Sequence, residues 1–503
     1  MHFSSDSDDK EFQELLKKAI RGDILEQVRL AQYYFSGKGV IQDKEKAVYW
    51  LMKAAEQGDS LAQNFLGDCY EYGEGIAKDD EKAFLWHMKA AEQGDAFAQF
   101  SLGDHYCKGI GGEKDEEKAI YWYTKSARQG NSLAQTSLGD YLCKKGGEKD
   151  YQEAVCWYML AAEQGNKFAQ FALALCYVNG QGVKEDKEKA IYWLTKAAEQ
   201  GNASVQFSLA LLYITGEGIK RDSEKAIYWL RKAAEQGHAE AQSALAFLHQ
   251  FSTGTNKDSE KSIYWYTKAA EQGDTVSQNL LGNCYFNGDG VERDRELAVY
   301  WYTKSAEQGD SYAQYVLGMC YGNGAGVEKN EEKAIQWYMK SVEQGNDRAQ
   351  TALASCYQYG AGVEQDHEKA VYWYVKAAEQ ENESAQFSLA FCYGNGRGVS
   401  RDLKKAAYWL TKAAEQGHAT AQLTLGLCYQ RGEGIEIDEE KAVFWITKAA
   451  EQGDATAQTA LGLCYQLGEG VEMDEEKAIY WYTKAAEQGD AKAQYNLREL
   501  RGN

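Results

Sequence analysis

Residues 454–489 read DATAQTALGLCYQLGEGVEMDEEKAIYWYTKAAEQG, and this stretch decides the fold because close variants of it recur along the 503-residue chain. Each variant carries one tryptophan at the same position, and successive tryptophans lie 36 residues apart except for one 35-residue step. A fixed period of this length indicates a tandem array of one structural unit. The thirteen tryptophans are Trp50, Trp86, Trp122, Trp157, Trp193, Trp229, Trp265, Trp301, Trp337, Trp373, Trp409, Trp445 and Trp481.

The unit is expected to fold as two helices joined by turns. Its first half has apolar residues at i, i+4, i+7 and i+8 and its second half at i, i+3, i+4 and i+7, which is one face of an α-helix in each case. Gly468 and Gly470 separate the halves, and Gly489 ends the second. Because one helix pair leaves apolar faces uncovered, each unit must stack on its neighbours. The face residues are Ala457, Leu461, Cys464 and Tyr465 in the first helix and Ala478, Trp481, Tyr482 and Ala485 in the second.

An aspartate or asparagine comes before every second helix, where its side chain can accept a hydrogen bond from a free backbone N–H group. Such a cap contributes about 1 kcal/mol, whereas burial of one tryptophan of about 200 Å² contributes about 5 kcal/mol. We therefore expect a continuous spine of buried indole rings to dominate stability. The thirteen predicted caps are Asp43, Asp79, Asp115, Asp150, Asp186, Asp222, Asp258, Asp294, Asn330, Asp366, Asp402, Asp438 and Asp474.

The pattern A-x-A-Q-x-x-L-G-x-C-Y-x-x-G-x-G-V-x-x-D-x-E-K-A-x-x-W-Y-x-K-A-A-E-Q-G resembles the Sel-like repeat, a relative of the tetratricopeptide repeat, over essentially the whole chain. The resemblance implies an all-α fold, a right-handed α/α superhelical solenoid of 36-residue helix-turn-helix repeats whose first helices line the concave side. It also implies a non-catalytic scaffold or adaptor that holds protein partners. We predict an N-terminal capping helix in residues 1–22, thirteen repeats in residues 23–489 and a C-terminal capping helix in residues 490–503.

The chain is strongly acidic, with 55 Lys and Arg against 76 Asp and Glu and a net charge of −21. A field of this sign repels phosphate backbones and anionic lipids, so we expect neither nucleic acid nor membrane surfaces as partners. No segment approaches the roughly 18 apolar residues that span a bilayer, and the opening MHFSSDSDDKEF is unlike a secretory signal. We predict a cytoplasmic protein, with export by a route without a cleavable signal peptide as the alternative. The sequence does not indicate an oligomeric state.

Eight of the eleven cysteines come one residue before the repeat tyrosine, where they fit as small core residues. Equivalent positions in stacked helices are expected about 10 Å apart, whereas a disulfide needs Cα atoms within about 7 Å. The cysteines are therefore predicted to be reduced thiols in a cytosol. The eight are Cys69, Cys176, Cys284, Cys320, Cys356, Cys392, Cys428 and Cys464.

Little in the chain points to catalysis or metal binding. None of the seven histidines makes an H-x-x-x-H pair, and the nearest candidate is His105 with Cys107. Cys143, the equivalent cysteine one unit later, would lie too far away for Zn–S bonds of about 2.3 Å. The G-x-G triplets follow helices rather than strands and are interpreted as helix-ending turns. The glutamine present in every first helix, such as Gln170, is expected to be structural. We predict no catalytic residue, no metal site and no small-molecule cofactor.

Function is expected in the positions that vary between units, because the constant ones serve stacking. By the resemblance, the groove-facing positions are two before the first-helix leucine, two after it, and five and six after it. Three aspartates begin this groove, and the apolar strip that follows them is typical of a contact surface. A peptide or helical segment of a protein partner is predicted to bind there, with Asn179, Asn287, Asn323 and Asn395 available to its backbone. The predicted groove residues are Asp68, Asp104, Asp140, Phe171, Leu175, Phe207, Leu211, Phe247, Asn283, Tyr315, Met319, Phe387 and Phe391.

Three alternatives stay open. The groove side chains could instead complete the packing between neighbouring first helices. The chain could also be a bacterial factor that uses the same groove on a host protein. A hydrolase would need Asp68, Asp104 and Asp140 to converge, which an expected spacing of about 10 Å per unit opposes.

Three places depart from the pattern. Unit four, LCKKGGEKD, has lost one residue, and unit seven, AFLHQFSTGT, has His249 for the tyrosine and Ser252 for the first turn glycine. Residues 143–150 and 249–257 could therefore be hinges, or the changes could be drift. Glu381 stands where a helix-ending glycine is expected, which costs about 1 kcal/mol if it keeps a left-handed conformation.

Overall fold

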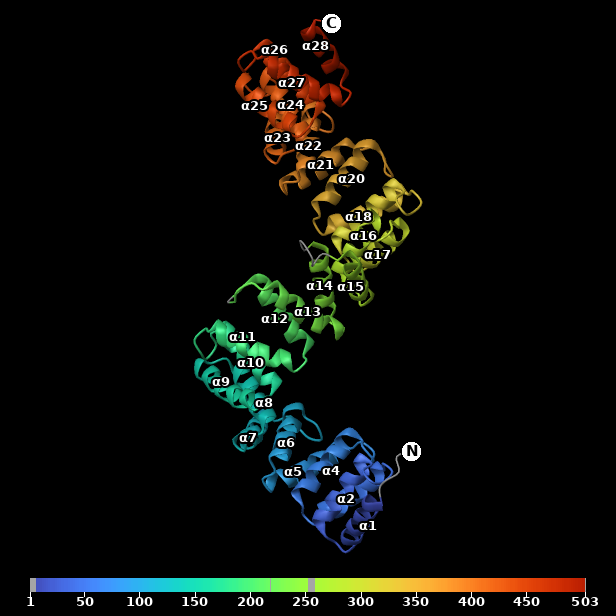
Figure 1. The fold of residues 1–503 in the computed structure, drawn as a ribbon, viewed down its shortest axis with the longest axis vertical. Coiled ribbons are helices and arrows are strands. Elements are labelled where there is room, and N and C mark those ends of the chain that lie inside the picture. Colours follow the sequence, from blue (N-terminus) through green and yellow to red (C-terminus); the bar gives the residue numbers. More distant parts are fainter. Residues whose placement is uncertain (1–5, 218, 252–257, 503) are drawn as a thin grey trace. The chain divides into compact units, whose positions relative to one another are not determined.

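The computed structural model describes residues 6–217, 219–251 and 258–502. These residues form 28 helices and no strand (Figure 1). They belong to two compact units, Met1–Ala241 and Gln242–Asn503. From α2 onward the helices come in pairs, an even-numbered first helix and an odd-numbered second helix in each repeat, and the two helices of a repeat pack against each other.

The helices up to the boundary at Ala241 are α1 (Asp6–Ile20), α2 (Ile24–Ser36), α3 (Lys44–Glu56), α4 (Ser60–Tyr72), α5 (Asp80–Glu92), α6 (Ala96–Lys108), α7 (Glu116–Arg128), α8 (Ser132–Lys145), α9 (Glu148–Glu163), α10 (Lys167–Asn179), α11 (Lys187–Glu199), α12 (Ala203–Thr215), α13 (Ser223–Glu235) and α14 (Ala239–Phe251), in which the boundary falls. The later helices are α15 (Ser259–Glu271), α16 (Thr275–Asn287), α17 (Arg295–Glu307), α18 (Ser311–Asn323), α19 (Glu331–Glu343), α20 (Asp347–Tyr359), α21 (His367–Glu379), α22 (Glu383–Asn395), α23 (Leu403–Glu415), α24 (Ala419–Arg431), α25 (Glu439–Glu451), α26 (Ala455–Leu467), α27 (Glu475–Glu487) and α28 (Ala491–Arg501). The capping role of α1 and α28 stays a prediction.

The core of a repeat combines small side chains with one large enclosed residue. In α26, Ala457, Leu461 and Cys464 are buried, as the helical periodicity predicts. Opposite them, Tyr482 of α27 is fully buried, and its ring lies so close to Gly462 that a Cβ there would approach Tyr482 Cδ1 to 2.8 Å. Glycine at this position therefore sets how closely the two helices of the repeat can pack.

The expected spine of buried indole rings is found only in part, because all thirteen tryptophans keep some exposed surface, and their dominance of stability stays a prediction. The residue after each tryptophan is the buried one, and Tyr266, Tyr302 and Tyr482 are among the largest fully buried side chains. The tryptophans instead lie between successive cores, as where Trp193 packs against clusters on both sides of it.

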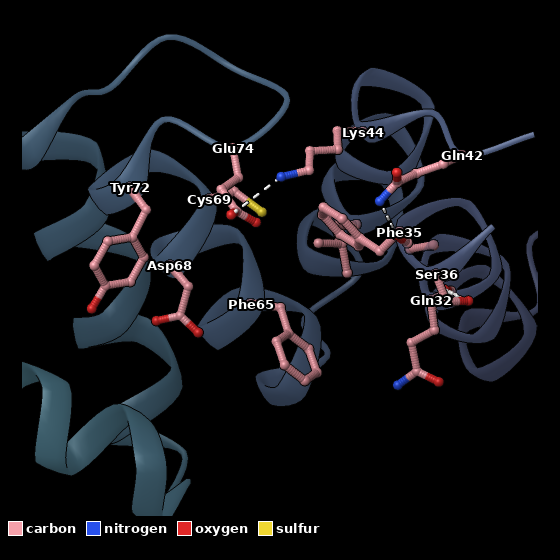
Figure 2. A pocket seen from close by; sticks show the side chains of 12 residues that line it. Gln32, Phe35, Ser36, Gln42, Lys44, Phe65, Asp68, Cys69, Tyr72 and Glu74 are labelled. Carbon is pink, nitrogen blue, oxygen red and sulfur yellow. Dashed lines mark hydrogen bonds and ion pairs between the residues drawn. The ribbon is translucent and has the colours of Figure 1, made fainter. Parts of the chain in front are cut away.

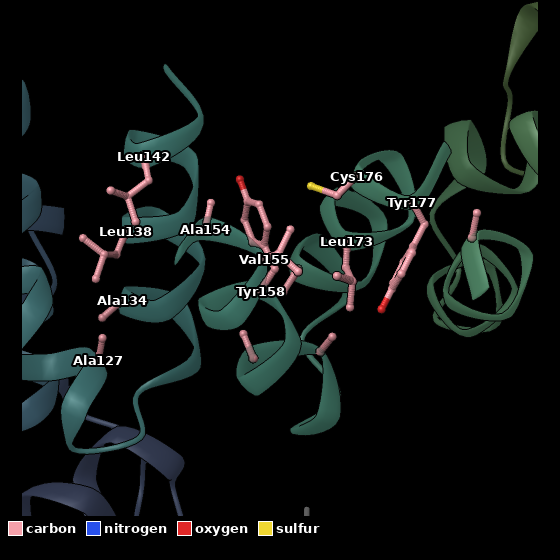
Figure 3. Packing of buried hydrophobic residues seen from close by; sticks show 14 residues of the cluster. Ala127, Ala134, Leu138, Leu142, Ala154, Val155, Tyr158, Leu173, Cys176 and Tyr177 are labelled. Atoms are coloured by element: carbon pink, nitrogen blue, oxygen red, sulfur yellow. The ribbon is translucent and has the colours of Figure 1, made fainter. Parts of the chain in front are cut away.

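Figure 3 shows one such core, formed by α7 to α11. Leu138 and Leu142 of α8 lie on one side of Tyr158, and Leu173 of α10 lies on the other. α8 and α9 form one repeat, and α10 belongs to the next. The part of the apolar face of α9 that α8 leaves uncovered is therefore covered by the following repeat.

Twelve of the thirteen predicted caps are confirmed, with the side-chain oxygen accepting from the backbone N–H three residues later at 2.8–3.0 Å. The prediction is wrong for Asp150. The residue missing from this unit shortens the connection, so that α9 begins at Glu148 after Gly147, without a side-chain cap. Asp150 therefore lies inside the first turn of α9, where it accepts from Lys145 Nζ at 2.7 Å.

The other irregular positions have different outcomes. Glu381 has φ = 65°, the one positive φ of a non-glycine residue among those the structure describes, so the left-handed conformation is confirmed. His249 is buried, whereas Ser252 and the rest of residues 252–257 lie outside the described residues. Whether units four and seven act as hinges stays a prediction.

The cysteines are free thiols, and seven of the eight at the repeat position are buried while Cys356 is half-buried. Burial raises the pKa of the Cys69 and Cys176 thiols to about 12, so these side chains stay protonated and pack as small apolar groups.

Candidate functional site on the first helices

Two hollows lie between the first helices of neighbouring repeats in the compact unit Met1–Ala241. The larger, about 720 Å³, lies between α2 and α4 and is lined by Phe35, Phe65, Asp68 and Tyr72 among others (Figure 2). These belong to the groove-facing positions two, five and six after the first-helix leucine, except Phe65, which comes one residue before it. Lys44 Nζ and Glu74 Oε1 form an ion pair of 3.3 Å among the lining residues.

A second hollow of about 420 Å³ lies at the equivalent place between α6 and α8. Its lining includes Cys107, Tyr123, Asp140 and Lys144. Asp140 is the counterpart of Asp68, and Lys144 that of Tyr72, so the same register forms both hollows with different chemistry. The variable positions of the repeat thus give each hollow its own lining.

The predicted apolar strip divides into exposed and packed residues. Leu175 and Leu211, in the compact unit Met1–Ala241, are exposed by 41% and 40%. Phe247 and Phe391, in the compact unit Gln242–Asn503, are exposed by 48% and 45%. These four come two residues after the first-helix leucine. Among the apolar residues predicted to face the groove, these four are exposed.

Residues two before that leucine serve mostly for packing between repeats. Phe171 packs on the core that contains Leu194, and the Phe207 ring lies 5.0 Å from the ring of His238, the cap of the next first helix. Phe387 stacks on His418 in the same way at 4.7 Å. For these positions the packing alternative is the better interpretation, and the same holds for half-buried Tyr315 and Met319, which contact the core of the following repeat.

The three groove aspartates are bound within their own part of the array rather than left free for one ligand. In each case Oδ1 accepts from the buried residue after the next tryptophan, and Asn283 does the same. The pairs are Asp68 with His87 Nε2 (3.1 Å), Asp104 with Tyr123 OH (2.6 Å), Asp140 with Tyr158 OH (2.6 Å) and Asn283 with Tyr302 OH (2.7 Å). Because each aspartate has a separate partner, the arrangement gives no pair of carboxylates acting on one bond.

Burial, and after it the aspartate bond, raises the pKa of the Tyr123 and Tyr158 hydroxyls far above the ordinary value. These phenols therefore remain donors over the physiological range. Their role is to hold the first helix against the second.

The four asparagines predicted to bond a ligand backbone are all exposed. Asn395 Nδ2 donates to the carbonyl of Phe391 at 2.9 Å, and Asn287 Nδ2 contacts Asp289 Oδ2 at 3.4 Å. At these two positions the amide oxygen and the second N–H hydrogen remain available to a ligand.

Sequence reasoning missed a row of exposed aromatic residues on the second helices. Ten of the thirteen residues that precede a tryptophan are aromatic, each is 49–55% exposed, and each ring meets the tryptophan edge-on at 4.9–5.2 Å. The signal was visible as an aromatic–Trp pair at a fixed phase. The residues are Tyr49, Tyr121, Tyr192, Tyr228, Tyr264, Tyr300, Tyr372, Tyr408, Phe444 and Tyr480. These exposed rings are a second candidate for a contact surface.

No helix in the described part of the chain combines the length and the apolar character needed to cross a bilayer. Helix pairs stacked at a 36-residue period define a repeat protein of the all-α solenoid class. The Sel1 repeat model matches thirteen consecutive segments that together cover residues 27–490, and the chain belongs to the Sel1 repeat family. The predicted family and the predicted fold class, an all-α superhelical solenoid, are thereby confirmed.

Two solved structures are similar over long stretches. The protective antigen c5321 of uropathogenic Escherichia coli, which displays an SLR fold, is 35% identical, with 90% of each chain covered and a TM-score of 0.66. A Sel1 repeat protein from Oxalobacter formigenes is 33% identical, with 65% of this chain and 93% of that chain covered and a TM-score of 0.52. No curated protein matches the chain. Sel1 repeat proteins generally mediate protein–protein interactions and are generally non-catalytic.

Proposed function

We propose that this chain is a non-catalytic scaffold that holds an extended peptide or an amphipathic helix of a protein partner against its first helices. The supporting observation is the hollow between α2 and α4, where Phe35 and Phe65 offer apolar contact beside the carboxylate of Asp68. Its volume of about 720 Å³ lies within the about 300–1,000 Å³ of ordinary ligand sites. Such a space accommodates one or two large side chains of a partner.

The exposed leucines determine how long the ligand must be. Leu175 and Leu211 lie one repeat apart, and covering a leucine that is two-fifths exposed contributes about 1 kcal/mol. One such contact does not offset the cost of association, which is at least about 4 kcal/mol. A partner segment that engages several successive repeats is therefore the form of ligand that fits.

The charges around the larger hollow favour a partner with basic residues. Asp68 keeps one oxygen beyond its bond to His87, and the Lys44–Glu74 pair lies among the same lining residues. Charges on such a rim set selectivity and association rate more than affinity. Salt should therefore slow association with little effect on the dissociation rate.

Site-specific photocrosslinking tests this surface. A benzoylphenylalanine in place of Tyr72, which lines the hollow and is 70% exposed, should crosslink the partner in cells that express the protein. The matched control carries the probe in place of Tyr121, which is 52% exposed on the second-helix aromatic row. Crosslinks from position 121 with none from position 72 would refute binding on the first helices.

A second candidate rests on the Escherichia coli relative, which is described as a protective antigen of uropathogenic strains. A bacterial factor directed at a host protein would use the same first-helix surface. Appearance of the full chain in the medium of intact cultures, with a cytosolic enzyme retained as a lysis control, supports this role. Complete retention inside the cells argues against it.

A further inference from the structure

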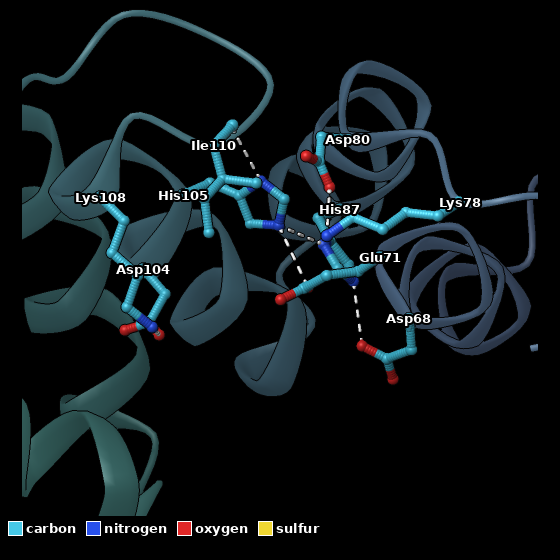
Figure 4. A network of polar contacts seen from close by, with 9 residues as sticks. All are labelled: Asp68, Glu71, Lys78, Asp80, His87, Asp104, His105, Lys108 and Ile110. Carbon is cyan, nitrogen blue, oxygen red and sulfur yellow. Dashed lines mark hydrogen bonds and ion pairs between the residues drawn. The ribbon is translucent and has the colours of Figure 1, made fainter. Parts of the chain in front are cut away.

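Two buried histidines meet between the second and third repeats. His87 of α5 is 0% exposed and His105 of α6 is 1% exposed, and Glu71 at the end of α4 reaches them from the side (Figure 4). His87 Nδ1 lies 3.2 Å from His105 Nε2, and Glu71 Oε2 lies 3.3 Å from the same Nε2. Three helices thus bring one potential ligand atom each to a common point.

The outer nitrogens of both imidazoles have partners that can only accept. His87 Nε2 lies 3.1 Å from a carboxylate oxygen of Asp68, and His105 Nδ1 lies 3.1 Å from the carbonyl oxygen of Ile110. Each outer nitrogen must therefore carry the hydrogen, which leaves the inner nitrogen of a neutral imidazole as a lone pair. With the carboxylate of Glu71, three acceptors face one another, and such an arrangement is repulsive unless a cation or a proton lies among them.

The spacing fits a tetrahedral metal ion. Zn–N bonds of about 2.0–2.1 Å at tetrahedral angles place two ligand atoms about 3.3 Å apart. Two of the three separations, 3.2 and 3.3 Å, match this edge, whereas the third, between Glu71 and His87, is bounded only by the 4.8 Å within which all three ligand atoms lie. The bonds to Asp68 and Ile110 are the outer contacts that orient metal-binding imidazoles in proteins.

We propose that Glu71, His87 and His105 bind one divalent transition-metal ion, for which Zn²⁺ is the natural candidate. Two imidazole nitrogens and one carboxylate suit zinc better than magnesium or calcium, which prefer oxygen ligands. The ion would tie α4, α5 and α6 together across the joint between two repeats. Asp68, which also lines the larger hollow, would then be a positioning residue for His87.

The other repeats give the matched replacements for a test. The position of His87 is Leu51 or Leu194 elsewhere, and the position of Glu71 is Gln358 or Gln430. His87→Leu and Glu71→Gln therefore install side chains that the same fold already accommodates. As a control, His418→Asn alters a helix cap for which other repeats use asparagine, far from the three ligands in sequence.

The experiment is a Co²⁺ titration of the full-length protein after chelator treatment, followed by visible absorption and checked by circular dichroism. The proposal predicts one Co²⁺ per chain with the bands of tetrahedral nitrogen and oxygen coordination and without the near-ultraviolet charge-transfer band of a thiolate ligand. His418→Asn keeps these bands. His87→Leu abolishes them, and Glu71→Gln weakens Co²⁺ binding at least tenfold at unchanged helix content.

Two results would overturn the proposal. The intact chain could show no saturable Co²⁺ spectrum, in which case a proton shared by the imidazoles is the occupant. Alternatively, the Co²⁺ bands could persist in both His87→Leu and Glu71→Gln, in which case the metal binds adventitiously elsewhere. Because Glu71 is at the edge of the cluster and half-buried, its variant keeps the test valid even if His87→Leu does not fold.

Discussion

The side-chain amide of Gln200 donates to Oε1 of Gln170 at 2.8 Å. Gln170 in turn donates to the backbone carbonyl of Ala162 at 3.1 Å, so one buried amide links α9, α10 and α11. The glutamine pair recurs in all thirteen repeats at 2.7–3.0 Å. This confirms the structural interpretation of the repeated glutamine.

Gln170→Ala should lower the free energy of unfolding by about 1–3 kcal/mol, because the carbonyl of Ala162 loses its side-chain donor and Gln200 keeps only its bond to the carbonyl of Gly165. Urea unfolding followed by circular dichroism measures the change. Gln152→Ala, at an exposed position of α9, should cost less than about 0.5 kcal/mol. Equal effects of the two variants would show that the amide link contributes nothing.

Gly282→Ala should destabilise the protein by about 1–3 kcal/mol, because overpacking forces the helices apart. The added Cβ would approach Tyr302 Cε1 to 2.7 Å. Repeats with alanine at this position pair it with leucine, as in Ala174 with Leu194, or with a tyrosine whose hydroxyl binds a glutamine, as in Ala354 with Tyr374, so Tyr302→Leu should partly rescue the alanine variant. Thermal unfolding of the single and double variants measures the coupling, and strictly additive losses would contradict the contact.

Glu381→Gly should raise stability by about 1 kcal/mol, because glycine adopts the left-handed conformation without strain. Gly345 and Gly417 occupy the equivalent place at φ values of 83° and 101°, with open space where a Cβ would lie. The strain at Glu381 is therefore conformational rather than steric. Glu379→Gln controls for the change of charge, and a gain of the same size in that variant would assign the effect to electrostatics instead.

Stability should fall in acid below about pH 4, where unfolded aspartates begin to bind protons. Nine cap aspartates have a pKa below the ordinary 3.8; for Asp438 and Asp474 the main cause is the bond from the backbone N–H three residues later, followed by the lysine side chain there. Since the folded pKa is depressed, the caps stabilise the protein above the unfolded pKa, and this is lost as pH falls through the folded pKa.

The measurement is the melting temperature between pH 7 and pH 2. The double variant Asp438→Asn and Asp474→Asn keeps its caps, as Asn330 does, but cannot titrate there, so its loss in acid should be smaller. Identical acid profiles for the two proteins would contradict the assignment to caps.

Most of the fold could be predicted from the local sequence pattern, because helix faces, helix-ending glycines and caps depend on neighbours within one repeat. Periodicity places both Trp481 and Tyr482 on the apolar side, but Tyr482 is the fully enclosed one because its ring packs against Gly462 of the paired helix, a contact that the pattern within one helix does not show. The prediction of a helix cap at Asp150 was wrong because a single missing residue moved the start of the helix. In each case the deciding information was the length or packing of a neighbouring element.

Less of the candidate site could be predicted from the sequence. The repeat positions predicted to face the groove include those that line the hollows. The bond between Asp104 and Tyr123, however, depends on how two helices pack against each other. The cluster of Glu71, His87 and His105 comes from three helices and contains no spacing motif, so linear reasoning paired His105 with Cys107 instead. Cys107 is exposed, whereas the two histidines are buried together.

The central claim is that a protein partner binds on the first helices, and the most direct test is the affinity of the partner identified by crosslinking. The double variant Phe65→Ser and Leu211→Ser removes two exposed apolar contacts of that face, and Tyr121→Ser with Tyr228→Ser removes two from the second-helix row. The account predicts that Kd rises at least about tenfold, or about 1.4 kcal/mol, for the first variant and stays unchanged for the second. Loss of affinity in the second variant with full affinity in the first would contradict it.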